Sequence, residues 1–336
     1  MIWYKEKNDN DIIVSTRVRL ARNLDKYPFP GILNEEGRNK VSEELKNAIL
    51  GSASTLANSF TYKAMADLLP EEKQALSEKH LISVDMALSE KGGVLLGEDE
   101  NMSIMLLEED HLRLQIILGG LRLKEAWELA DKVDSVIEEN ASYAFSEEFG
   151  YLTACPTNTG TGMRASVMMH LPALTVTNNM SKIISSASKL GLTVRGLYGE
   201  GSKAYGNLYQ VSNQVTLGLT EKEIIEKVKN IVNQIAEHEK QARKKLLENN
   251  RDYIEDKIYR AYGILKYART ISSKEAKSLI SDVLMGKNMG IINIDNGELI
   301  ELMIMAEPAY IEHMAKKKLS PEERDKTRAE LIRDTI

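Results

Sequence analysis

Hydrophobic and polar positions alternate with a period of two in several stretches of the first 220 residues. Residues 14–20, 112–116 and 209–217 share this period, which is typical of strands with one buried face. Between them lie segments with helical spacing, such as 181–190, which Gly191 ends. We therefore predict an α+β fold in which an antiparallel sheet is flanked by helices.

The pattern changes after residue 219, where helical spacing dominates. Thr220 followed by Glu223 is a capping-box signature, and Ser272 and Ser320 begin further helices with good N-cap chemistry. The charged run 240–250 is more typical of a solvated helical face than of a binding motif. We expect an α+β domain over residues 1–242 and a mainly helical domain over 243–336, although no linker marks the boundary.

The composition is that of an ordinary soluble protein with a large core. The chain has 336 residues, of which 43% are hydrophobic and 28% charged. Its net charge of -6 argues against nonspecific nucleic-acid binding. Cys155 is the single cysteine and the five histidines lack ligand spacing, so we predict no internal disulfide and no tightly held metal. Because neither a signal-peptide pattern nor a membrane span is visible, we expect a cytoplasmic protein without a membrane or nucleic-acid partner.

Residues 155–166 form a loop of small residues with two glycines, followed by Arg164 as the pattern becomes regular. Such glycines let a backbone approach a ligand closely, and a guanidinium suits a phosphate. The loop is not a Walker A motif, because Gly-Lys-Ser/Thr does not follow. A tight turn between two strands is the alternative interpretation.

Arg17 and Arg19 lie in the alternating stretch that begins at Ser15. In an extended chain they point to one face, while Thr16, Val18 and Leu20 point to the other. Two like charges on one sheet face repel each other unless an anion lies between them. The alternative is a solvent-exposed outer face.

Two further segments combine arginine with acidic residues. If residues 108–113 approach a strand, Glu109, His111 and Arg113 share one face and Leu112 covers the core; the alternative is a charged turn whose members pair with one another. Arg195 and Glu200 lie in a glycine-rich segment, which could instead be a flexible hairpin or lid. Together, the four arginine-bearing segments fit one clamp for a polyphosphate.

These segments resemble the motifs of the ATP:guanido phosphotransferases. They are Ser-Thr-Arg-Val-Arg at 15–19, Glu-Glu-Asp-His-Leu-Arg at 108–113, Cys-Pro-Thr-Asn through Arg-Ala-Ser-Val at 155–167 and Arg-Gly-x-x-Gly-Glu at 195–200. They occur in the family's order, and the resemblance covers about residues 12–242. The chain is similar to the protein-arginine kinase branch, since its first motif begins at Ser15 and leaves no room for the N-terminal domain of the small-molecule enzymes. The resemblance therefore implies an open site that admits a protein side chain.

Two positions depart from the pattern of the small-molecule enzymes. Tyr198 stands where they commonly have a second arginine, and the protein-arginine kinase branch resembles this chain there. Thr159 stands where a leucine is usual. The first change implies an altered phosphate clamp, and we expect the second to be minor.

The resemblance implies that ATP is bound with Mg²⁺ bridging its phosphates and mostly water completing the ion's shell. His80 would lie beside the adenine, unless it is an ordinary surface histidine. Arg17, Arg19, Arg113, Arg164 and Arg195 would contact the phosphates. The nucleotide-contacting stretches would comprise Ser15, Thr16, Arg17, Val18 and Arg19; Arg164, Ala165, Ser166, Val167 and Met168; and Arg195, Gly196, Leu197, Tyr198, Gly199 and Glu200.

Three residues would carry the catalytic roles of the family. Glu109 would be the base that takes a proton from the acceptor guanidinium, and Glu200 would hold this group from another side. Cys155 would lie near the acceptor, where surrounding arginines favour a thiolate; a plain buried cysteine is the alternative.

The sequence Arg324-Asp325-Lys326-Thr327-Arg328-Ala329 lies near the end of the chain. Arg324 and Arg328 fall one helical turn apart, so both could hold a phosphate, and Asp325 could pair with a guanidinium. The pattern resembles the allosteric phosphoarginine-binding motif of the protein-arginine kinases, which also includes Ala329. A solvated helix with internal salt bridges is the alternative.

The resemblance finally implies a cellular role. The chain would phosphorylate exposed arginines of proteins, marking them for unfoldase-protease machinery and silencing a stress-response repressor. An activator protein and a homodimer formed by the helical domain would be its partners. A kinase for a free guanidino metabolite and a catalytically silent phosphoarginine-binding adaptor are the competing hypotheses.

Overall fold

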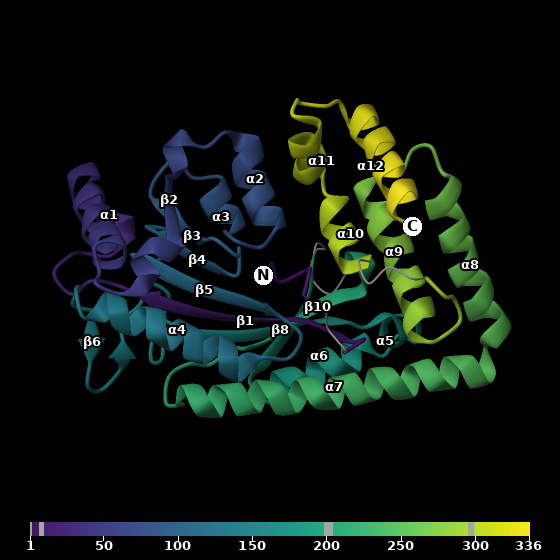
Figure 1. Cartoon of the computed structure of the whole chain (residues 1–336). Coiled ribbons are helices and arrows are strands. Elements are labelled where there is room, and N and C mark those ends of the chain that lie inside the picture. The colour runs from purple at the N-terminus through teal and green to yellow at the C-terminus, as the bar shows by residue number, and fades with distance from the viewer. Residues whose placement is uncertain (1, 7–9, 198–203, 295–298) are drawn as a thin grey trace. The chain divides into compact units, whose positions relative to one another are not determined.

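The fold is built on an eight-stranded sheet, seen in the computed structural model in Figure 1, which confirms the predicted α+β class. The structure describes residues 2–6, 10–197, 204–294 and 299–336. The strands are β1 (Ile13–Arg22), β2 (Phe60–Ala64), β3 (Gly93–Gly97), β4 (Met102–Leu106), β5 (Leu112–Gly119), β8 (Met163–His170), β9 (Leu192–Gly196) and β10 (Leu208–Asn213), with β6 (Phe145–Ser146) and β7 (Gly150–Tyr151) forming a separate pair. The order in the large sheet is β2-β3-β4-β5-β1-β8-β10-β9. The pairs β1–β5, β2–β3, β3–β4 and β4–β5 are antiparallel.

Helices make up most of the remaining chain. They are α1 (Glu35–Leu50), α2 (Pro70–Glu78), α3 (Val84–Ala87), α4 (Leu123–Glu138), α5 (Pro172–Val176), α6 (Met180–Lys189), α7 (Glu221–Asn249), α8 (Arg251–Tyr267), α9 (Ser273–Asn288), α10 (Leu299–Met305), α11 (Pro308–Ala315) and α12 (Pro321–Thr335). Short 3₁₀ turns are η1 (Pro30–Ile32), η2 (Thr55–Ser59), η3 (Met65–Asp67) and η4 (Tyr205–Asn207). The helical part after residue 220 agrees with the prediction.

The chain divides into two compact units. The first comprises Met1–Glu6, Ser15–Ser166 and Ser212–Lys229, and the second comprises Lys7–Val14, Val167–Val211 and Asn230–Ile336. The predicted boundary after residue 242 lies inside α7, so the division into domains 1–242 and 243–336 stays a prediction.

In the first unit, helices cover both faces of the strands β3 to β5 (Figure 1). α4 buries Ala126, Ala130 and Val133, and α2 and α3 lie over an apolar cluster that includes Val94 and Met105. Residues that lie opposite each other in an antiparallel pair have side chains on the same face of the sheet. Met105 lies opposite Val94 on one side and opposite Arg113 on the other, and Arg113 lies opposite Ala21 of β1. Arg17 and Arg19 of β1 and Arg113 of β5 therefore lie on the face that α2 and α3 cover.

The predicted helix starts are present with their capping bonds. Thr220 Oγ1 accepts from the Glu223 amide at 3.3 Å, while Glu223 accepts from the Thr220 amide at 2.7 Å. Ser320 caps α12 with the same reciprocal pair of bonds, and the Ser272 hydroxyl accepts from the Glu275 amide at the start of α9. Gly191, with φ 72°, follows the end of α6, as predicted.

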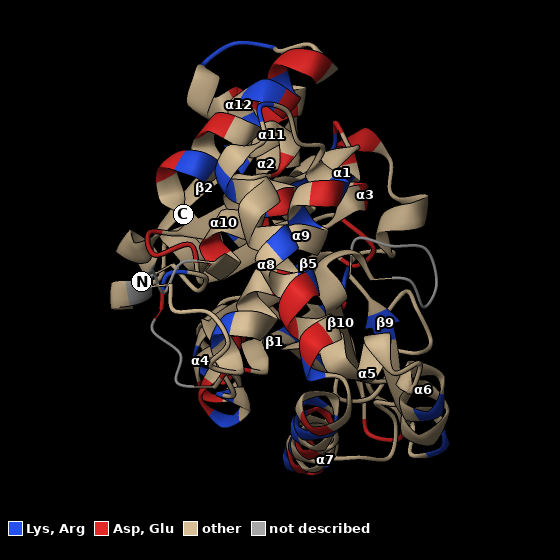
Figure 2. Ribbon diagram, turned by 90° about the vertical axis from the view of Figure 1, so that its right-hand side faces the viewer, with Lys and Arg blue, Asp and Glu red and all other residues tan. Residues whose placement is uncertain are grey.

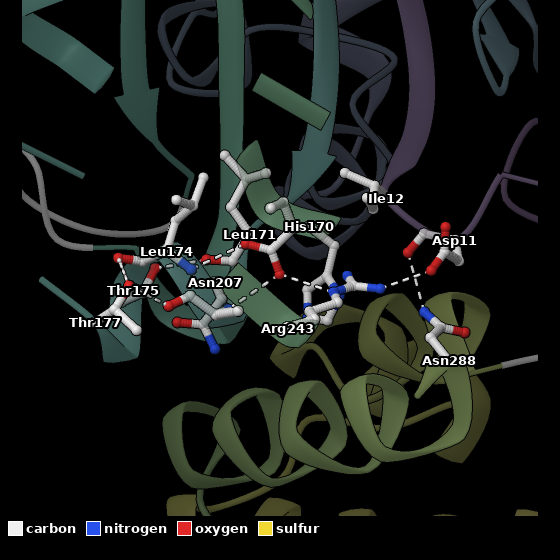
Figure 3. A network of polar contacts seen from close by, with 12 residues as sticks. Asp11, Ile12, His170, Leu171, Leu174, Thr175, Thr177, Asn207, Arg243 and Asn288 are labelled. Carbon is white, nitrogen blue, oxygen red and sulfur yellow. Dashed lines mark hydrogen bonds and ion pairs between the residues drawn. The ribbon is translucent and has the colours of Figure 1, made fainter. Parts of the chain in front are cut away.

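A buried polar network organises the second unit (Figure 3). Glu239 of α7 accepts from the first amides of α5, at Ala173 and Leu174, and pairs with Arg243 at 2.9 Å. Arg243 also pairs with Asp11 at 2.6 Å. The charged run 240–250 was therefore only partly interpreted correctly: Figure 2 shows both signs of charge around α7, but Arg243 is buried.

The third predicted strand ends earlier than its alternation suggests. β10 stops at Asn213, whose side chain accepts from the Ala165 amide and donates to the Met163 and Val215 carbonyls. Side-chain bonds of this kind replace the ladder. Thr216 instead donates to the carbonyls of Thr157 and Thr159. Within the described ranges, no helix is both long and apolar enough to cross a membrane.

Candidate active site

The arginine row of β1 has the predicted alternation. Arg17 and Arg19 are partly exposed, whereas Val18 and Leu20 are buried. Arg19 lies opposite Gln115 on β5. The side-chain Nε2 of Gln115 donates to the His80 backbone carbonyl at 2.7 Å. His80 therefore lies near the same face of the sheet as the arginines.

The acidic segment before β5 is a turn rather than an extension of the strand. β5 begins at Leu112, and Arg113 pairs with Glu108 at 2.6 Å and with Glu109 at 3.0 Å. The members of the turn thus pair with one another, as the alternative interpretation states. The expected shared face fails for His111, which is fully buried and bonded through its ring to the Leu24 amide and the Pro28 carbonyl. Burial lowers the pKa of this imidazole.

The glycines of the 155–166 loop permit close backbone packing. Gly162 has φ 63°, and a Cβ there would lie 2.6 Å from the Ala21 carbonyl oxygen. The Ala21 amide donates to the Gly162 carbonyl at 2.9 Å. The close approach that we predicted toward a ligand is thus made, in this structure, toward β1.

Five of the predicted site residues line one cavity in the first unit. Its volume is about 170 Å³, and it is lined by Arg19, Leu20, Ala21, Glu109, Arg113, Cys155, Thr157, Asn158, Gly162 and Arg164. Cys155 is partly exposed, with Sγ 3.1 Å from the Thr157 hydroxyl. Arg164 donates to the Ser212 hydroxyl at 3.0 Å. Segments from β1, β5, β8 and the loop therefore meet at one site.

The cavity concentrates positive charge. Burial, and then the charges of Arg17, Arg113 and Arg164, lower the pKa of Arg19 well below its usual value. The Arg19 Nε is buried with no hydrogen-bond partner among the described residues. Buried donors normally find partners, so this arrangement is suited to an anion that neutralises several guanidinium groups.

Other predicted residues lie outside this lining. Ser15, Thr16 and Val18, together with Ala165, Ser166 and Val167, have buried side chains, and Met168 is 9% exposed. Arg195 is exposed on β9, followed by Gly196 and Leu197 in the second unit. Tyr198, Gly199 and Glu200 lie outside the described residues. The nucleotide contacts of these stretches stay predictions.

The motif in α12 is engaged by the protein itself. Arg328 is 1% exposed, and it donates to the carbonyls of Ala306 and Ile271 at 2.6 and 2.9 Å and to Asp325. Arg324 pairs with Glu312 of α11 at 2.8 Å. The internal salt bridge between Asp325 and Arg328 agrees with the alternative interpretation, but the other bonds join α12 to Glu312 of α11 and to the connecting segments at Ile271 and Ala306. Ala329 is fully buried beside them.

Sequence reasoning did not single out several residues of the site. Thr157 and Asn158 line the cavity, and Glu108 binds Arg113; all three lie within the motif segments 108–113 and 155–167. Asp110 and Asn23 lie behind the cavity lining and are buried. Polar residues beside a motif carry a weak signal, because only tertiary structure shows which of them turn inward. Among the described residues, no group of three or more His, Cys, Asp or Glu could hold a metal ion.

Comparison with known proteins agrees with this geometry. Residues 40–242 match the family model of the ATP:guanido phosphotransferase C-terminal catalytic domain, and residues 251–336 match that of the protein-arginine kinase McsB C-terminal domain. The protein-arginine kinase of Caldanaerobacter subterraneus subsp. tengcongensis is 50% identical over 325 residues, which cover 96% of each chain. That of Brevibacillus brevis is 48% identical over 337 residues, covering 99% of this chain and 94% of the relative.

Solved structures show the same fold. The duplicated taurocyamine kinase of Schistosoma mansoni with bound transition-state-analogue components has a TM-score of 0.63 and 28% identity, over 70% of this chain and 34% of that one. A lombricine kinase has a TM-score of 0.61 and 25% identity, over 70% of this chain and 68% of that one. The chain therefore belongs to the ATP:guanido phosphotransferase family of enzymes, in the branch of the protein-arginine kinases.

Proposed function

We propose that this protein transfers the γ-phosphoryl group of ATP to arginine side chains of other proteins. The observation that carries the proposal is the cavity in which Arg19, Arg113 and Arg164 meet the carboxylate of Glu109. Arginine forks suit phosphate oxygens, and a carboxylate suits a guanidinium acceptor. The names of the full-length relatives support a protein as the source of that acceptor.

The arginines of the cavity would hold the phosphates of ATP. Arg19, Arg113 and Arg164 already lie together, and Arg17 adds its charge to theirs. An anion relieves their mutual repulsion and allows the γ-phosphoryl group to be held in line with the acceptor. Arg195 would also contact the phosphates, and His80 would lie beside the adenine.

Glu109 would act as the base. A guanidinium stays protonated at neutral pH, so the nitrogen must lose a proton as its bond to phosphorus forms and the bond from phosphorus to the ADP oxygen breaks. The pair between Glu109 and Arg113, 3.0 Å apart, supports this role, because the carboxylate already accepts from one guanidinium. When phosphate oxygens bind Arg113, Glu109 becomes available to the acceptor.

Two further groups would assist at the acceptor. Glu200 would hold the guanidinium from another side. Cys155 lines the cavity with Glu109, so its sulfur would lie near the acceptor cation. A planar cation satisfies both acids, whereas a neutral side chain would leave them unpaired.

Mg²⁺ would be carried by ATP rather than by a protein cage. Glu108 and Glu109 are both bound by Arg113, so they do not form a carboxylate site for the ion. The phosphates of ATP and water would hold the ion. When bound, it neutralises phosphate charge.

The C-terminal helices would form a regulatory phosphoarginine site. The match of residues 251–336 to the C-terminal domain of a protein-arginine kinase supports this assignment. Arg324 would exchange Glu312 for the phosphate, while Asp325, Arg328 and Ala329 would form the remaining wall. We further propose a cytoplasmic homodimer with an activator protein, whose products are marked for unfoldase-protease machinery and include a stress-response repressor.

Transfer to different acceptors tests the proposed function. The protein is incubated with ATP and Mg²⁺ and either an arginine-rich protein or free arginine, and acid-labile phosphate is measured by mass spectrometry. We expect labelling of the protein. Labelling of free arginine alone would make the enzyme a small-molecule guanidino kinase, and labelling of neither would favour a silent phosphoarginine-binding adaptor.

A further inference from the structure

A buried carboxylate lies directly behind the candidate base. Asp110 follows Glu109 in the turn before β5, and it is 0% exposed. Its Oδ1 accepts from the Ala154 amide at 2.7 Å and from the Asn23 amide nitrogen at 2.7 Å. Ala154 directly precedes Cys155, so Asp110 joins the segment of the base to the loop of the cysteine.

Asn23 completes this connection from the end of β1. Its Oδ1 accepts from the His111 amide at 2.9 Å, and its Nδ2 also donates to the Leu152 carbonyl at 3.1 Å. Asn23 is 1% exposed. One buried pair, Asp110 and Asn23, thus ties together three segments that each carry cavity residues: β1 with Arg19, the turn with Glu109, and the loop with Cys155.

The second carboxylate oxygen of Asp110 indicates that this side chain does more than stabilise the fold. Oδ2 is buried with no hydrogen-bond partner in the part of the chain that the structure describes. A buried acceptor without a partner is unfavourable. Both short hydrogen bonds go to Oδ1. The donors at Ala154 and Asn23 therefore fix the orientation of the Asp110 side chain, although its second oxygen gains no bond.

We infer that Asp110 is a positioning residue, which sets the place of Cys155 relative to Glu109 through the Ala154 amide. This inference rests on the proposed function, because it assigns the purpose of the connection to phosphoryl transfer. Turns and loops such as 107–111 and 155–162 have few constraints of their own. Reacting groups must nevertheless be held to well within 1 Å, and a displacement of that size lowers rates by about 100-fold.

The hydrogen bonds, rather than the charge, carry this role. Asp110→Asn can keep Oδ1 as an acceptor for both donors, whereas Asp110→Ala removes it. We expect Asp110→Ala to lower kcat by about 100-fold with the KM for ATP nearly unchanged, and Asp110→Asn to restore most of kcat. Asn23→Ala should also lower kcat, because it removes the second tie while leaving Asp110 in place.

The control is a variant that removes a buried hydrogen bond in the same unit, away from the residues that line the cavity. Lys73 Nζ donates to the Ser89 carbonyl at 2.9 Å and pairs with Glu90, so Lys73→Met should lower the unfolding midpoint without changing kcat. Equal loss of kcat in Lys73→Met and Asp110→Ala would reduce the effect to general destabilisation and overturn the inference. If Asp110→Ala does not fold, the other two variants test the inference. It requires high activity of Asp110→Asn and low activity of Asn23→Ala.

Alkylation of Cys155 by iodoacetamide separates this inference from the proposed function, since it requires no kinase activity. We expect the alkylation rate in Asp110→Ala to differ from that of the wild type and Asp110→Asn to restore it. Unchanged rates in Asp110→Ala and Asn23→Ala would overturn the positioning role. A changed rate in a protein that labels no arginine would leave the positioning of the loop intact and reject the proposed function instead.

Discussion

The two arginines of the α12 motif should differ strongly in their contribution to stability. Arg328 is 1% exposed, while the Arg324 side chain is 27% exposed. Arg328→Ala leaves the carbonyls of Ala306 and Ile271 without their donors and leaves a void where the side chain lay. Each unsatisfied buried group costs about 1–3 kcal/mol, so we expect a loss of roughly 3–5 kcal/mol.

Arg324→Ala removes only a partly exposed pair with Glu312, which contributes about 1 kcal/mol or less. Thermal unfolding followed by far-UV circular dichroism measures the difference, and Arg328→Ala should unfold roughly 10 °C lower than the wild type. Arg251→Ala, which removes an exposed pair with Glu255, is the matched control. Midpoints of Arg328→Ala and Arg324→Ala that agree within about 2 °C would refute this reasoning.

This asymmetry decides how the proposed phosphoarginine site is tested. Loss of binding in Arg328→Ala reports unfolding as well as lost contacts, so Arg324→Ala is the informative variant. We expect its affinity for phosphoarginine, measured by titration calorimetry, to fall while its fold stays intact. Affinity equal to that of the wild type would reject the second site.

Three further predictions follow from other parts of the molecule. Alkylation of Cys155 should slow phosphoryl transfer, and ATP with a protein acceptor should protect the thiol, since Cys155 lines the cavity; full activity after complete alkylation would reject its role. Gly162→Ala should lower the free energy of unfolding by about 2 kcal/mol or more. An alanine at φ 63° strains the backbone, and its Cβ would lie only 2.6 Å from the Ala21 oxygen. A change below about 0.5 kcal/mol in denaturant unfolding would contradict this. Burial and the charge of Arg243 lower the pKa of His170 well below its usual value. As the pH falls, His170 is therefore protonated in the unfolded chain before it is protonated in the folded protein. The free energy of unfolding should thus rise with pH from about 5 to 7, by up to about 1.4 kcal/mol per pH unit. His170→Gln should flatten that rise in denaturant unfolding measured at each pH, and an unchanged slope would contradict the assignment.

Local patterns predicted the elements that depend on local physics. The alternation on β1 placed Arg17 and Arg19 on one face because a strand has a period of two. The caps at Thr220, Ser272 and Ser320 were visible because capping bonds span only three residues.

Features that depend on distant partners were not predictable. His111 turns inward because its Nδ1 accepts from the Leu24 amide and its Nε2 bonds to the Pro28 carbonyl, and nothing near residue 111 signals these partners. Arg328 is buried because of carbonyls at residues 271 and 306. Asp110 bonds Ala154 across 44 residues, so its role could be seen only once the fold placed both segments side by side.

The most direct test of the account is phosphoarginine formation by the cavity itself. Tandem mass spectrometry of an arginine-rich protein, incubated with ATP and Mg²⁺, should show phosphoarginine with the wild-type enzyme. Glu109→Ala should abolish it, and Arg19→Met should lower the rate by about 100-fold or more. Phosphoarginine formed at the wild-type rate by Glu109→Ala or Arg19→Met would contradict the account.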